Sequence, residues 1–99
     1  MSVQVLPVAQ AAKIHAFAEL ESKKKVTSAE LIATMKNYVD GGWAISSRVV
    51  ISLIDRVILT NTEKHLLAGY AENGAADQME RGHSKDAHEH KMVLARLSR

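Results

Sequence analysis

The stretch WAISSRVVISLIDRVILT, residues 43–60, is the most apolar part of the chain. Its β-branched side chains would suit a strand, but a strand would place Asp55 among the apolar groups on one face. In a helix, the polar residues instead form a single strip: Arg48, Ser52, Asp55 and Arg56. The rest of the circumference is then apolar over roughly 200°. The pattern predicts a helix over residues 46–59, with Ser46 or Ser47 as its N-cap.

Two further helices are expected before this stretch. Pro7 is the only proline and suits a first helical turn, so an alanine-rich helix is predicted over residues 7–22. Thr27 and Glu30 have the spacing of a capping box and start a helix that runs to about Val39. The apolar residues of this second helix share one face: Leu31, Ile32, Met35, Tyr38 and Val39. Gly41-Gly42 then ends it, because glycine accepts the left-handed backbone of a helix terminus.

After residue 60 the pattern becomes helical again. Asn61 or Thr62 is the expected cap, and the helix is expected to stop at Asn73-Gly74. Its apolar face consists of Leu66, Leu67 and Tyr70. Residues 75–99 predict a last helix that Gly82 interrupts or bends. One heptad-like stripe is expected along it: Ala76, Met79, His83, His90, Val93, Leu94 and Leu97.

These patterns predict one all-α domain over residues 1–99, a compact bundle of four to five helices. The length of 99 residues, the 46% hydrophobic content and the 24% charged content fit an ordinary globular domain. With no cysteine, disulfides, thiolate metal sites and a cysteine nucleophile are excluded. There is no signal-peptide pattern and no apolar run near the roughly 20 residues of a membrane span. We therefore expect a soluble, cytoplasmic protein without membrane contact.

An apolar arc as wide as that of helix 46–59 must be covered from several sides. The helix is therefore expected either at the centre of the bundle or partly covered by a second copy of the chain, as in a homo-oligomer. The residues expected to be buried in this way are Val49, Val50, Ile51, Leu53, Ile54, Val57 and Ile58.

An alternative interpretation is a helix-turn-helix transcriptional regulator that binds DNA. A capped helix, a glycine-containing turn and a second helix follow one another in that order. The segment SSRVVISLIDRVI, residues 46–58, resembles the recognition helix of winged-helix repressors of the MarR type. In this alternative Arg48 and Ser52 face base edges, and the basic run supplies backbone or anion contacts through Lys23, Lys24 and Lys25. Against it, the connection DGGWAIS has seven residues, no basic wing follows, and Asp55 would repel phosphate.

The histidine-rich segment GHSKDAHEHK, residues 82–91, is the other place where chemistry could be located. Asp86 and His90 are four residues apart and would share a helix face, as metal ligands do. His83 and His90 are two turns apart, about 10.5 Å, so one ion cannot bind both on a straight helix. We expect no metal and no cofactor, with Asp86 and His90 as the only weak candidates.

No nucleophile elbow, phosphate loop, dinucleotide fingerprint or zinc-protease motif occurs, so we expect no enzyme. The sequence favours a small regulator or inhibitor that binds a protein partner, in the style of the small proteins of phages and mobile elements. Trp43, the single tryptophan, lies in a turn and is a candidate anchor, together with Arg48, Ser52 and Arg56. A third alternative is an oligomer that holds a small anionic ligand near the lysine run.

Overall fold

The computed structural model describes residues 16–99, and this part of the chain contains five helices and no strand. In chain order they are α2 (Ala16–Ser22), α3 (Ser28–Asp40), α4 (Ser47–Arg56), α5 (Asn61–Glu80) and α6 (Ser84–Leu97). The prediction of an all-α fold is confirmed. Pro7 and the first half of the helix predicted over residues 7–22 lie outside the described residues, whereas the predicted end at Ser22 is confirmed.

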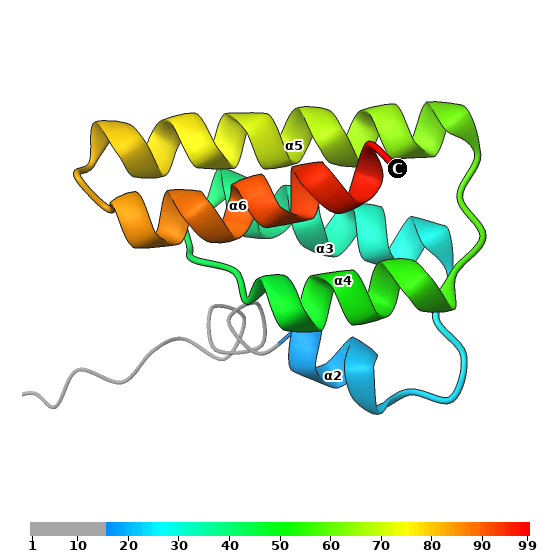
Figure 1. The fold of residues 1–99 in the computed structure, drawn as a ribbon. Coiled ribbons are helices and arrows are strands. Elements are labelled where there is room, and N and C mark those ends of the chain that lie inside the picture. Colours follow the sequence, from blue (N-terminus) through cyan, green and yellow to red (C-terminus); the bar gives the residue numbers. More distant parts are fainter. Residues whose placement is uncertain (1–15) are drawn as a thin grey trace, which may run out of the picture.

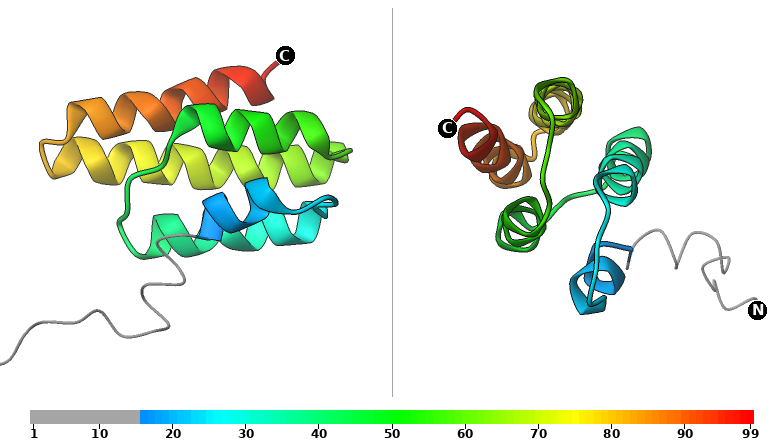
Figure 2. Two further views of the ribbon diagram at one scale, coloured as in Figure 1. Left: turned by 90° about the horizontal axis from the view of Figure 1, so that it is seen from below. Right: turned by 90° about the vertical axis from the view of Figure 1, so that its right-hand side faces the viewer.

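The described helices form a closed ring around one apolar core. α2 packs on α3, α3 on α5, α5 on α6, α6 on α4, and α4 on α2, as the end-on view of Figure 2 shows. α4 and α6 run in the opposite direction to α3 and α5 (Figure 1). The core is made of Phe17, Leu20, Leu31, Met35, Tyr38, Ile45, Val50, Leu53, Ile54, Leu67, Ala71, Val93 and Leu97. α4 is therefore one wall of the ring, not the central helix that the width of its apolar arc suggested.

Capping boxes begin the two helices whose N-cap residue is a threonine, α3 and α5. At α3 the Thr27 hydroxyl accepts from the Glu30 amide, and the Glu30 carboxylate accepts from the Thr27 amide, as predicted. The Lys23 ammonium and the Thr27 amide donate to the same carboxylate and lower the pKa of Glu30 to about 2. At α5 the same box joins Thr60 and Glu63. The predicted cap at Asn61 or Thr62 is therefore wrong, because the hydroxyl that has its partner three residues later is that of Thr60.

α4 is shorter than the helix predicted over residues 46–59. Ser46 is its N-cap, as expected, but the helix ends at Arg56, and Val57 has extended backbone angles of φ −117° and ψ 152°. Beyond it Ile58 is 96% exposed, so its predicted burial is wrong. This segment crosses from the end of α4 to the start of α5 (Figure 1), which requires extended backbone, and β-branched residues favour that conformation. Val50, Leu53 and Ile54 are buried as predicted, while Val49, Ile51 and Val57 are only partly buried.

α5 continues through Asn73-Gly74, so the predicted end there is wrong. The chain reverses instead at Gly82, whose φ of +78° is the left-handed conformation of a helix end. The single stripe predicted from Ala76 to Leu97 is therefore divided between two antiparallel helices. The two members of this stripe that lie on α5, Ala76 and Met79, are exposed, Met79 at 52%. Leu66, which was expected on the apolar face of the same helix, is 45% exposed.

The continuation of α5 depends on a close contact between Gly74 and His90. A Cβ atom placed on Gly74 would lie 2.3 Å from His90 Cδ2 and 2.4 Å from His90 Nε2, so the imidazole rests directly on the glycine backbone. His90 is 0% exposed, and its Nδ1 lies 3.0 Å from the Asp86 carbonyl oxygen, which makes Nδ1 the protonated nitrogen. Glycine weakens a helix interior by about 1 kcal/mol, and here the packing of α6 against α5 outweighs that preference.

Within residues 16–99, no helix combines the length and the apolar character that crossing a membrane requires.

Replacing Gly74 with alanine is expected to lower the free energy of unfolding by roughly 1–3 kcal/mol, because the new methyl group forces the His90 ring away from α5. The matched control is Gly69→Ala on the same helix, where a Cβ would have no neighbour within 4 Å. That substitution is expected to raise stability by up to about 1 kcal/mol. Urea unfolding followed by circular dichroism measures both. Equal effects of the two substitutions would contradict the assigned contact.

Candidate functional site

Two arginines of the polar strip on α4 face α2, which lies beside it in the ring. The Arg56 guanidinium donates to the Glu21 carbonyl oxygen at 3.0 Å and also to the Lys23 carbonyl oxygen. Arg48, two turns earlier, lies 3.5 Å from the Glu21 carboxylate. The cations of α4 therefore hold the carboxyl-terminal end of α2, where the helix dipole and unpaired carbonyl groups favour positive charge.

The other side of α4 is tied to α6. The Asp55 carboxylate forms an ion pair with Arg96. The backbone amide and the hydroxyl of Ser47 both donate to the Glu89 carboxylate at 3.2 Å, which places a negative charge at the amino-terminal end of α4. The residues that the sequence suggested for contact with a partner are thus largely engaged within the chain, and only half-buried Ser52 has no such role.

The arrangement of α3 and α4 differs from that of a helix-turn-helix. In that motif the two helices cross at about 90–120°, whereas here they run roughly antiparallel along the ring (Figures 1 and 2). In the basic run, Lys23 forms an ion pair with Glu30, and Lys24 and Lys25 are exposed. Binding of DNA stays a prediction from sequence, without a basic recognition face on α4 to support it.

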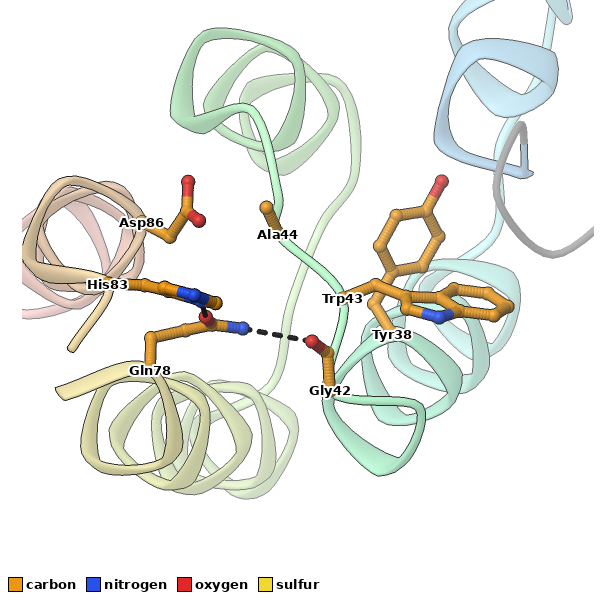
Figure 3. Close-up of a pocket in the computed structure, with 7 residues that line it drawn as sticks. All are labelled: Tyr38, Gly42, Trp43, Ala44, Gln78, His83 and Asp86. Carbon is orange, nitrogen blue, oxygen red and sulfur yellow. Dashed lines mark hydrogen bonds between the residues drawn. The ribbon is translucent and has the colours of Figure 1, made fainter. Parts of the chain in front are cut away.

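Trp43 lies half-buried in the loop between α3 and α4. Its ring meets that of Tyr38 edge-on, with 5.7 Å between the centroids, and Tyr38 in turn contacts Phe17 of α2 at 4.4 Å. Burial raises the pKa of Tyr38 above its ordinary value. The tryptophan thus joins the turn to the core, and one side of it borders a pocket (Figure 3).

This pocket, of about 390 Å³, lies between the carboxyl-terminal ends of α3 and α5. Gln78, only 2% exposed, donates from its amide nitrogen to the Gly42 carbonyl oxygen at 3.0 Å (Figure 3). The Gln78 amide oxygen lies 2.9 Å from Nδ1 of His83. The Gln78 amide therefore joins the end of α5 to the turn after α3 and also contacts His83. The Asp86 carboxylate is the charged group among the residues that line the pocket.

The structure does not bring Asp86 and His90 together as a metal site. The Asp86 carboxylate borders the Trp43 pocket, whereas the His90 ring is packed against Gly74. In the described part of the chain, no group of three histidine, aspartate or glutamate side chains is placed to hold a metal ion.

A groove that the sequence did not predict lies between α4 and α6. It measures about 350 Å³ and is lined by Ile51, Asp55, Met92, Ala95, Arg96 and Arg99. Ile51 is half-buried, Ala95 is exposed, and Met92 is 41% exposed, so apolar side chains form much of its surface. We call this the α4–α6 groove.

An exposed stripe of α6 includes three of the residues that line this groove, Met92, Ala95 and Arg99, and continues along the helix beyond it. Its members recur at intervals of three and four residues: Lys85, His88, Met92, Ala95 and, just past the helix, Arg99. Lys91 lies exposed beside it. We call Lys85, His88, Met92, Ala95 and Arg99 the outer stripe. The predicted stripe of His90, Val93, Leu94 and Leu97 is buried or partly buried, as expected, so the sequence indicates which face of this helix turns outward. It does not show that α4 lies beside that face, and the groove between the two helices is therefore not predicted.

A third, smaller hollow of about 280 Å³ lies between the start of α5 and the end of α6. Its basic residues are Lys64, His65 and Arg99, not the lysine run proposed for an anionic ligand.

No protein family model, no curated protein and no solved structure matches this chain. The site must therefore be interpreted from its own geometry.

Arg56→Ala is expected to lower the free energy of unfolding by roughly 1–2 kcal/mol, because two carbonyl groups at the end of α2 lose a charged donor. Arg48→Ala should change it by less than about 0.5 kcal/mol, since Arg48 makes only an exposed ion pair. Chemical unfolding of both variants makes the comparison. An effect of Arg48→Ala as large as that of Arg56→Ala would overturn the assignment of Arg56 to holding α2.

Proposed function

We propose that this protein is a small regulator or inhibitor that acts by binding a protein partner rather than by catalysis, and that the α4–α6 groove is its binding site. The observation that carries the proposal is the apolar surface of this groove: Ile51, Met92 and Ala95 gather in one hollow and remain open to solvent. Methionine adapts its shape to different partners and is frequent at protein-binding surfaces.

Other exposed apolar residues do not form such a surface. Ile58 lies in the loop before α5, and Leu66 and Met79 lie more than three turns apart on α5. Single exposed apolar side chains are common on soluble domains and need no function. The α4–α6 groove differs because its apolar residues come from two helices and because charged groups surround them.

The surroundings of the groove are also fixed in place. The Asp55–Arg96 ion pair and the bonds from Ser47 to Glu89 join α4 and α6 directly. A surface that is held rigid before binding loses less conformational entropy when a partner docks. The groove is therefore organised for recognition without rearrangement of the helices.

Formation of a homo-oligomer stays a separate proposal. Light scattering on the purified chain decides it, and no contact described here depends on the answer.

Met92→Glu is expected to abolish partner binding, because it places a carboxylate among the apolar residues of the groove. The matched control is Met79→Glu, at an exposed methionine of α5 outside the groove. In affinity capture from the native cells followed by quantitative mass spectrometry, a partner should be retained by the wild type and by Met79→Glu. It should fall by about tenfold or more with Met92→Glu, the equivalent of at least 1.4 kcal/mol. Identical captured proteins for all three chains would show that the groove is not the binding site.

A further inference from the structure

Resting on the proposed function, we propose that the segment of the partner that binds the α4–α6 groove is an acidic amphipathic helix. Its apolar face would lie on Ile51, Met92 and Ala95. Its carboxylates would meet three cations: Lys85 and Arg99 at the ends of the outer stripe, and Lys91 beside it.

The first argument is the uncompensated charge of α6. Lys85, Lys91 and Arg99 are exposed, and none of them forms an ion pair within residues 16–99. Five other cations of the described chain have carboxylate partners: Lys23, Lys36, Arg48, Arg81 and Arg96. Lys24, Lys25 and Lys64 also have none, but they do not line the α4–α6 groove and do not lie on α6.

The acidic residues of α6 form no ion pair with these cations. Glu89 is held by Ser47 at the start of α4, and Asp86 borders the Trp43 pocket. Lys85, Lys91 and Arg99 are therefore exposed cations beside the groove with which the carboxylates of a partner would pair.

The second argument is the spacing of the outer stripe. Residues at intervals of three and four form the face that one helix presents to another, with the apolar residues in the middle and charges at the flanks. The small side chain of Ala95 lets a second helix approach closely, because the distance between helix axes depends on the side chains at the contact. A helical partner matches this spacing, whereas an extended strand would need an open sheet edge, and the described chain contains no strand.

A second copy of this chain fits the surface less well. In a symmetric dimer the same patch meets itself. Two outer stripes in contact would therefore bring the cations of one copy, Lys85, Arg99 and the neighbouring Lys91, near those of the other. Like charges brought together across an interface are unfavourable. Nucleic acid fits less well too, because Ile51, Met92 and Ala95 give the groove an apolar surface, whereas phosphate contacts require polar donors and cations.

The test uses the full chain and two synthetic helical peptides of about three heptads. Both peptides carry leucine and alanine on one face, and the remaining positions are glutamate in one and lysine in the other. Fluorescence anisotropy measures affinity, and amide chemical shifts of the protein locate the site. The acidic peptide should bind at least tenfold tighter than the basic one, with shifts centred on Ile51, Met92 and Ala95.

Charge-reversal variants separate the outer stripe from general attraction. Lys85→Glu/Lys91→Glu should weaken binding of the acidic peptide by about tenfold or more. The control Lys24→Glu/Lys25→Glu makes the same change of net charge in the loop between α2 and α3 and should weaken it by less than about twofold. Circular dichroism confirms that both variants keep the helical fold.

Four results would overturn the inference: equal affinity for the two peptides, equal weakening by the two double variants, shifts away from the groove, or concentration-dependent shifts of the outer stripe without peptide. The last result would identify a second copy as the occupant. Tighter binding of a duplex oligonucleotide than of the acidic peptide at the same residues would identify nucleic acid instead. If these results appear while Met92→Glu still removes a captured protein, the proposed function stands and only the acidic helix is wrong.

Discussion

The close contact between Gly74 and His90 is the constraint from which the arrangement of the second half of the chain follows. A buried imidazole that rests on a glycine backbone fixes the distance between α5 and α6 and also the rotation of α6 about its own axis. With His90, Val93 and Leu97 turned inward, the residues half a turn away must face outward. The same rotation directs Glu89 toward the start of α4 and exposes Met92.

The apolar face and most of the charged strip of α4 are engaged by other parts of the chain. Its buried side contributes Val50, Leu53 and Ile54 to the core. Its polar side is divided between two neighbours, because Arg56 holds the carbonyl end of α2 and Asp55 binds Arg96 of α6. What remains available for a partner is the groove beside α4, where apolar side chains meet unpaired cations of α6.

Sequence patterns predict the parts of the fold in which the interacting residues are only a few positions apart in the chain. The capping box of Thr27 and Glu30 and the end of α3 at Gly41-Gly42, where Gly42 has a φ of +70°, can be recognised within a few residues of sequence. The role of Gly74 cannot be recognised locally, because it depends on His90, which lies beyond the turn on the next helix. Arg56 was misinterpreted because its partners are backbone carbonyls 33 and 35 residues away, which no side-chain pattern reveals. The α4–α6 groove could not be predicted either, because it requires α4 to lie beside the outward face of α6, which no local pattern reveals.

The most direct test of this account is a nuclear Overhauser measurement on the isotope-labelled full chain. A strong signal is expected between the Hδ2 proton of the His90 ring and the α protons of Gly74, because Cδ2 lies 2.3 Å from the position that a Cβ of residue 74 would take. The ring protons are also expected to show no contact with bulk water, since the side chain is 0% exposed. Absence of that signal, together with a hydrated ring, would show that α6 is turned differently and that the groove described here is not on the surface.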